Sequence, residues 1–181
     1  MKTLEDQMSF YAAYHQDARN KATHFVGVPL IVFSLMIPLG WLRADAGGFP
    51  VSAALVVTSV LLLYYLVLDV PLGLAMAAVF GLMLWGAEPL SQASLGSSAA
   101  WFVILFVAGW ALQLWGHAFE GRKPALVDNI FQIFVAPIFL AAEVFFALGY
   151  KPALHDVVQR RAREMRAKAG VGVARGDLKS A

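Results

Sequence analysis

Apolar residues are gathered in five runs, each close to the length of a transmembrane helix, with short polar stretches between them. About 20 predominantly apolar residues of helix span the hydrocarbon core of a bilayer. The first four runs, which we predict to be membrane spans, cover Phe25–Leu42, Val51–Leu68, Val70–Ala87 and Ala99–Phe119. Residues 3–23 have a polar-to-amphipathic pattern that predicts a helix ahead of the first span.

A fifth apolar run, Ile130–Gly149, differs from the others because it contains Pro137 and Glu143. A helix that faces lipid avoids an acidic side chain, since an ionised group is costly in hydrocarbon. Full crossing by this run would also place the C-terminal tail on the side opposite the N-terminus. We therefore favour a re-entrant or broken fifth segment, which returns the tail to the N-terminal side.

The composition agrees with an integral membrane protein and excludes a soluble domain, a disordered chain, a coiled coil and a repeat solenoid. Of the 181 residues, 60% are hydrophobic and 14% are charged, whereas soluble domains have about 45–50% apolar and about 25% charged residues. The predicted fold is an all-α integral membrane helical bundle of four to five spans. No cysteine is present, which excludes disulfides, thiolate metal sites, iron–sulfur clusters and a catalytic thiol.

Charge divides the chain into a membrane-embedded domain, residues 1–150, and a basic tail, residues 151–181. The tail holds eight Lys and Arg against three acids, and its apolar side chains recur at helical spacing over residues 152–169. This pattern is typical of an interfacial amphipathic helix on anionic lipid, and not of nucleic-acid binding. Basic residues also gather on the N-terminal side of the spans, so the positive-inside rule makes that side cytoplasmic. The alanine-rich composition and basic tail indicate a bacterial inner membrane.

The most informative residues are the ionisable and amide side chains among the spans, because such groups are costly in a membrane and mark functional sites. Under this topology His15, His24 and His117 reach the same membrane face. Asn20 lies four residues before His24, and Glu120 lies three residues after His117, so each pair shares a helix face. Imidazole binds iron, zinc, copper and nickel. The three histidines are therefore a candidate metal centre.

A shared site for His15 and His24 has a structural consequence. The two residues are nine apart, which places them on opposite faces of one straight helix. The helix must therefore bend near Gln16–Asn20 if both side chains serve one site. The alternative is that each histidine lies at headgroup level or bonds a neighbouring carbonyl.

Two further residues have open roles. Asp69 lies in the turn between two spans on the same face as the histidines, where it either belongs to the site or caps the helix that starts at Val70. Aspartate is a preferred N-cap residue. His155 joins the other histidines as a fourth ligand if the tail returns to their side.

Two sequence blocks carry a family resemblance. The first contains Tyr14-His15, Asn20-Lys21 and His24-Phe25-Val26-Gly27-Val28-Pro29, and the second contains Gln113-Leu114-Trp115-Gly116-His117, Glu120, Pro124-Ala125-Leu126 and Ala136-Pro137. In this order the blocks resemble the membrane 2-hydroxy fatty acid dioxygenases, whose fungal members act in phytosphingosine breakdown and which were long catalogued as a domain of unknown function. The resemblance covers about residues 8–150.

The resemblance implies an iron(II)-dependent α-oxidation in a lipid bilayer. A 2-hydroxy fatty acid and O2 would give the fatty acid one carbon shorter and CO2. The four electrons released from the acid reduce one O2 fully, so no co-substrate is required. Family membership places the metal on His15, His24 and His117, with His155 as a further position, and implies site roles for Asn20 and Glu120.

Two other functions remain open from the residues. Zinc on the same histidines would activate water against a lipid ester or amide, which makes a membrane lipid hydrolase the second hypothesis. The third is a non-enzymatic scaffold or transporter, although the sequence has no internal repeat of the kind that transporters use. The identity of the metal distinguishes the first two hypotheses.

Overall fold

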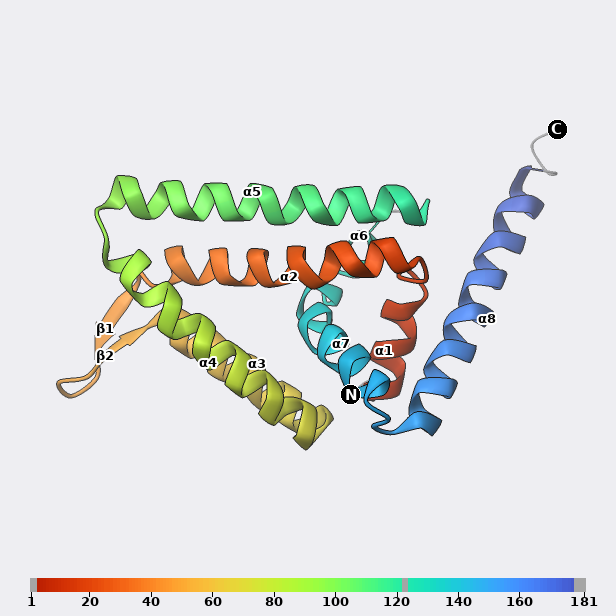
Figure 1. The fold of residues 1–181 in the computed structure, drawn as a ribbon, viewed down its shortest axis with the longest axis horizontal. Coiled ribbons are helices and arrows are strands. Elements are labelled where there is room, and N and C mark those ends of the chain that lie inside the picture. Colours follow the sequence, from red (N-terminus) through yellow and green to blue (C-terminus); the bar gives the residue numbers. More distant parts are fainter. Residues whose placement is uncertain (1–2, 122–123, 178–181) are drawn as a thin grey trace.

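The computed structural model describes residues 3–121 and 124–177, and Figure 1 shows that helices make up almost all of this part of the chain. The elements are α1 (Leu4–Ala12), α2 (Ala18–Leu39), β1 (Arg43–Asp45), β2 (Pro50–Ser52), α3 (Ala53–Leu68), α4 (Val70–Gln92), α5 (Leu95–Glu120), α6 (Ala125–Asp128), α7 (Gln132–Ala147) and α8 (Pro152–Asp177). The prediction of an all-α membrane bundle is confirmed. Three helices, α2, α4 and α5, are long and apolar enough to cross a membrane.

The second predicted span, α3, is shorter than its apolar run. It has 16 residues, which is roughly 24 Å of helix and less than the ~30 Å hydrocarbon core. The run loses its first residues because Pro50–Ser52 pairs with Arg43–Asp45 as an antiparallel hairpin. The Ser52 side chain then caps α3 by accepting a hydrogen bond from the Leu55 amide at 3.2 Å.

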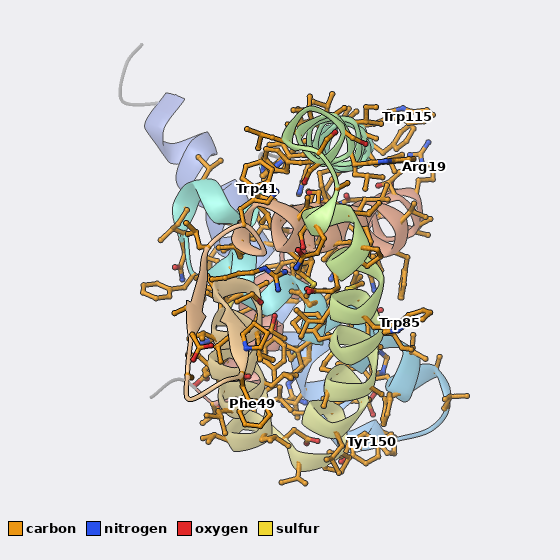
Figure 2. All side chains as sticks on the ribbon, turned by 90° about the vertical axis from the view of Figure 1, so that its left-hand side faces the viewer. Arg19, Trp41, Phe49, Trp85, Trp115 and Tyr150 are labelled. Atoms are coloured by element: carbon orange, nitrogen blue, oxygen red, sulfur yellow. The ribbon has the colours of Figure 1, made fainter. Side chains whose placement is uncertain are left out.

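The lipid-facing surface carries large apolar side chains. Figure 2 shows Trp85 and Trp115 pointing away from the ribbon, and both are mostly exposed, as are Val67 and Leu82. Monomeric soluble proteins rarely leave so much contiguous apolar surface in water. The exposed surface therefore fits a protein whose solvent is the bilayer, with tryptophans at its interfaces.

Helices α2 and α5 lie side by side along their lengths (Figure 1) because glycines let their backbones approach. A Cβ atom on Gly109 would lie 3.0 Å from the Gly27 carbonyl oxygen and 2.7 Å from Cγ1 of Ile31. A Cβ atom on Gly27 would lie 2.9 Å from the Gly109 carbonyl oxygen. Small residues allow such close contact between membrane helices.

Both ends of α7 lie at the end of the bundle that carries α1. At its start, Nε2 of Gln132 donates to Oε1 of Gln7 in α1 at 3.5 Å. Just after its end, the Tyr150 hydroxyl donates to Oδ1 of Asp69, in the turn between α3 and α4, at 3.3 Å. Helix α7 runs through Pro137 without the predicted break, and the re-entrant course of this segment stays a prediction.

Helix α8 packs against α1 and stays at the same end of the bundle (Figure 1). Its buried face includes Val158 and Ala162, which matches the predicted amphipathic pattern. Arg161 forms ion pairs with Glu5 at 2.7 Å and with Asp6 at 3.2 Å. The tail therefore returns to the side of the N-terminus.

Candidate metal centre

The first two helices are separated by a bend that carries His15. Helix α1 ends at Ala12, and α2 begins at Ala18 after Asp17, whose side chain caps it by accepting a hydrogen bond from the Arg19 amide at 2.8 Å. The bend thus occupies residues 13–17, slightly earlier than the predicted Gln16–Asn20. It places His15 on the same side as His24, as a shared site requires.

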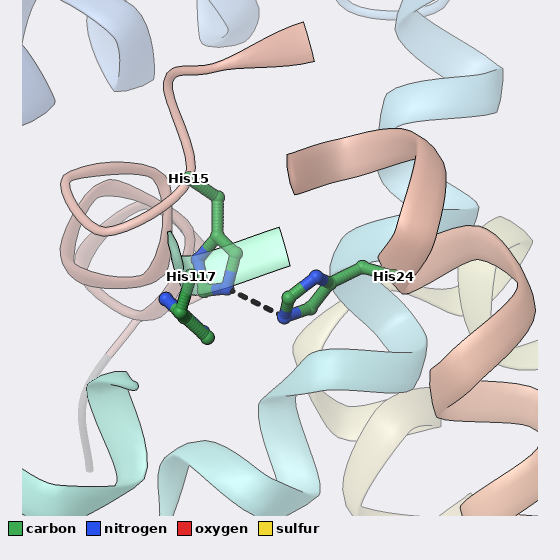
Figure 3. A group of neighbouring side chains, drawn as sticks. All are labelled: His15, His24 and His117. Atoms are coloured by element: carbon green, nitrogen blue, oxygen red, sulfur yellow. Dashed lines mark hydrogen bonds between the residues drawn. The ribbon is translucent and has the colours of Figure 1, made fainter. Parts of the chain in front are cut away.

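Three histidines from three different segments meet beside this bend. Figure 3 shows His15 from the bend, His24 from α2 and His117 from α5 with their rings turned toward one another. One ring nitrogen from each lies within 4.8 Å of the others. All three side chains are buried, with at most 6% of the residue exposed. The grouping is the predicted trihistidine cluster.

Backbone carbonyls fix the tautomers of two of these rings. Nδ1 of His15 lies 2.8 Å from the Tyr11 carbonyl oxygen, and Nδ1 of His24 lies 2.8 Å from the Asn20 carbonyl oxygen. A carbonyl oxygen only accepts, so both Nδ1 atoms carry the proton and donate. Each neutral ring then presents its Nε2 lone pair to the centre of the cluster. Carbonyl bonds of this kind orient histidines that bind metals.

The two lone pairs face each other at short range. Nε2 of His15 lies 3.1 Å from Nε2 of His24, the contact drawn as a dashed line in Figure 3. With both protons on Nδ1, neither Nε2 has a hydrogen to donate to the other. A cation beside the pair would satisfy both nitrogens, so these residues fit a metal ion.

Burial keeps His15 in the form that binds metals. Removal of the ring from water lowers the pKa of His15 well below its usual 6.5, and the nearby His24 ring lowers this pKa further. The ring is therefore neutral at physiological pH. Metal binding requires a neutral imidazole, so no proton has to leave His15 before a metal binds.

Glu120 and Asn20 hold the bend, and Glu120 is not part of the group that could hold a metal. Oε2 of Glu120 accepts hydrogen bonds from the Gln16 amide at 3.0 Å, the Asp17 amide at 2.7 Å and Nδ2 of Asn20 at 3.1 Å. Its other oxygen forms an ion pair with Arg166 of α8. Both residues were predicted for the site, and the structure places them beside it, with their side chains bound to the segment that carries His15.

Two predicted site residues lie away from the cluster. Asp69 caps α4, since its Oδ1 accepts a hydrogen bond from the Leu72 amide at 3.1 Å, and it also forms an ion pair with Lys151. His155 lies on α8, half-exposed, with its ring centroid 5.1 Å from that of Phe146. Among the residues that the structure describes, only His15, His24 and His117 form a group of three or more His, Asp or Glu side chains that could hold a metal ion.

Gly116, to which the sequence pattern assigned no role, determines how closely α5 approaches the site. A Cβ atom on Gly116 would overlap Oγ1 of Thr23 and would lie 2.5 Å from Oδ1 of Asn20 and 3.2 Å from Nδ1 of His24. The absence of a side chain therefore brings α5 close enough for the next residue, His117, to join the cluster. The position of Gly116 directly before His117 in the sequence is the feature that could have indicated this role.

We expect Gly116→Ala to push α5 away from His24 and to weaken the cluster. Overpacking of this kind destabilises by about 1–3 kcal/mol, and metal affinity should fall with it. Thermal unfolding in detergent and metal content per chain measure both effects.

Gly81→Ala is the matched control, because a Cβ atom there meets nothing within 4 Å in the described structure. We expect it to leave stability unchanged or to raise it by up to about 1 kcal/mol, since alanine favours helix. Equal behaviour of the two variants would contradict the role of Gly116.

The histidines form one end of a cavity of about 60 Å³ between α2, α5 and α7. Its walls are largely apolar and include Val28, Ile31 and Trp110. Gln113 and Gln132 also line it and add amide groups near the histidines. A small set of polar groups in an otherwise apolar hollow is typical of ligand sites.

Comparison with known proteins identifies the family. The model of the Mpo1-like family, described as "2-hydroxy-palmitic acid dioxygenase Mpo1-like", matches residues 1–148. The chain is also 34% identical over 172 residues to the 2-hydroxy-palmitic acid dioxygenase MPO1 of Saccharomyces cerevisiae, covering 90% of this chain and 95% of that protein. No solved structure matches significantly. This chain belongs to the Mpo1-like family.

Proposed function

We propose that this protein is an iron(II)-dependent dioxygenase that converts a 2-hydroxy fatty acid and O2 into the fatty acid one carbon shorter, CO2 and water. The observation that carries the proposal is the pair of Nε2 atoms of His15 and His24, 3.1 Å apart with both protons held on Nδ1. The activity for which the yeast relative is named supports the reaction class.

The reaction balances without a further reductant. The bond between C1 and C2 breaks, C1 leaves as CO2, and C2 becomes the new carboxyl carbon. These changes release four electrons, which reduce one O2 fully. One oxygen is gained by the organic products and the other leaves as water.

The chain's own residues would provide the setting for this chemistry. Three neutral imidazoles would hold the metal and leave coordination positions open, as non-haem iron sites require for oxygen chemistry. Iron(II) bound there would supply the single-electron steps that allow O2 to react with the acid. The Asn20 and Tyr11 carbonyls orient two of the rings, and the apolar walls of the cavity exclude water from the reacting carbons.

The test is iron(II) reconstitution of the purified protein without oxygen, followed by 2-hydroxypalmitate and O2. We expect about one fatty acid of 15 carbons and one CO2 for each O2 consumed. Zinc that iron cannot displace, together with ester hydrolysis, would instead support the hydrolase. Absence of tightly held metal and of turnover would overturn the proposal.

We further propose that the protein lies in a bacterial inner membrane with the trihistidine cluster at the cytoplasmic face. Basic residues at that end support this orientation through the positive-inside rule. They include Arg19 and Lys21 at the start of α2 and Arg160 and Arg163 on α8. The opposite end carries the hairpin of β1 and β2.

Single cysteines test this topology directly, because the chain has none of its own. We expect Ala46→Cys, in the exposed hairpin turn, to react with an impermeant maleimide in intact cells. Arg163→Cys, exposed on α8, should react only after the membrane is opened. Reaction of both from outside would mean that the fifth apolar segment crosses the membrane.

A further inference from the structure

Two buried amide side chains that line the cavity each have a polar atom without a hydrogen-bond partner among the described residues. These atoms are Nε2 of Gln113 and Oε1 of Gln132. Gln113 is 7% exposed and Gln132 is 1% exposed, and both side chains line the cavity that the histidines close. Buried polar groups are nearly always paired, so an unpaired donor and an unpaired acceptor in one cavity point to a ligand.

A chain of hydrogen bonds fixes which way the Gln132 amide points. Nε2 of Gln132 donates to Oε1 of Gln7 at 3.5 Å, and Nε2 of Gln7 donates to the Tyr64 hydroxyl at 3.0 Å. The amide nitrogen of Gln132 is thus turned toward α1. Its oxygen is left as an unpaired acceptor on a side chain that lines the cavity, and a ligand hydroxyl is a suitable donor for it.

Gln113 lies one helical turn before His117 on α5, so the two side chains share a face of the helix. Its Nε2 packs over Gly27 of α2, where a Cβ atom would lie only 2.9 Å away. The missing side chain at Gly27 therefore leaves room for the amide next to the cluster. Nε2 is a donor only, and a carboxylate oxygen is a strong acceptor for it.

We propose that Oε1 of Gln132 accepts a hydrogen bond from the 2-hydroxyl group of the substrate and that Nε2 of Gln113 donates one to its carboxylate. The inference rests on the proposed function and makes Gln132 the residue that selects a 2-hydroxy acid over an unhydroxylated fatty acid, while Gln113 holds the carboxylate that both acids share. A 2-hydroxy acid offers the one donor and the acceptor oxygens that the two amides lack. Its acyl chain would run along the apolar wall of Val28, Ile31 and Trp110.

Binding without turnover tests the assignment. The iron(II)-reconstituted protein is titrated without oxygen with a stearate that carries a nitroxide on its chain. The nitroxide quenches the fluorescence of Trp110, and the signal of this residue is the part of the fluorescence that Trp110→Phe removes. Palmitate and 2-hydroxypalmitate then compete with this probe. We expect wild type to bind 2-hydroxypalmitate at least about tenfold tighter than palmitate, because a site built to bond a hydroxyl penalises the acid that lacks it.

The two variants should fail in different ways. Gln132→Met should reduce the preference for the hydroxy acid to within about twofold and leave palmitate binding unchanged, since the hydroxyl is the only group of either acid that loses its partner. Gln113→Met should weaken both acids by a similar factor of about ten, because both carry the carboxylate. Gln92→Met, on the exposed end of α4, is the control and should behave as wild type.

The outcomes separate this inference from the proposed function. A Gln132→Met protein that keeps its iron and its full preference for the hydroxy acid overturns the inference, whatever its turnover. Wild type that shows the expected preference but no oxidation of 2-hydroxypalmitate overturns the dioxygenase and supports the amide assignment. Wild type that binds neither acid overturns both.

Discussion

A His24→Ala variant is expected to lose its iron and all measurable turnover of 2-hydroxypalmitate. The ring of His24 presents Nε2 to the cluster because its Nδ1 is bonded to the Asn20 carbonyl. Its removal takes away one of the three imidazoles that surround the centre. Loss of groups that merely orient metal ligands typically costs 10–100-fold in affinity, so loss of a ligand itself should exceed about 100-fold. Metal content per chain after dialysis measures this directly.

His155→Ala is the matched control for that experiment. His155 is half-exposed on α8 and lies outside the cluster that the described residues form. We expect its variant to keep wild-type iron content and activity. Loss of iron in His155→Ala would show that α8 brings a fourth ligand to the metal. Full iron content in His24→Ala would refute the trihistidine centre.

Glu120→Ala should destabilise the protein and release the bend that carries His15. The change leaves the Arg166 guanidinium, two backbone amides and the Asn20 amide without their shared acceptor. Breaking a buried pair costs about 3–5 kcal/mol, and we expect about 3 kcal/mol here because Arg166 is 33% exposed. Iron affinity should fall by about 10–100-fold, since the bend positions a ligand. Thermal unfolding and iron titration measure the two effects.

The ion pair of Glu88 with Arg43 provides a control at the opposite end of the bundle. The pair is 2.9 Å long, but Glu88 is 50% exposed, so Glu88→Ala should change stability by no more than about 1 kcal/mol. It should leave iron affinity unchanged. A Glu120→Ala protein with wild-type iron affinity would mean that the bend keeps its shape without the carboxylate.

Arg166 gives α8 a structural link to the segment that carries His15 of the trihistidine cluster. The family model matches residues 1–148 and so ends before α8 begins at Pro152. Yet Arg166 pairs with the carboxylate that holds Gln16 and Asp17 in place. The tail is therefore part of the architecture around the site as well as a basic segment suited to anionic lipid.

The sequence by itself determined the class of fold, and it also singled out the three histidines that the structure brings together. Long apolar runs have few stable structures other than helices in a bilayer, because every backbone amide must be bonded within the chain. The nine-residue interval between His15 and His24 required a bend, and Asp17, a helix-capping residue, marks the point where the second helix begins. These features are local, so spacing and residue type were enough to predict them.

Only the tertiary structure decided how the neighbouring polar residues are used. Glu120, Asp69 and His155 all lie at one end of the bundle, and spacing along the chain could not rank their distances from the cluster. The outcome depended on contacts between segments far apart in sequence, such as Glu120 with the bend and Asp69 with Lys151. The place of His117 beside His24 depends in turn on the glycine contacts that bring α2 and α5 together. Such distances arise from side-chain packing between helices, which no periodicity within one helix encodes.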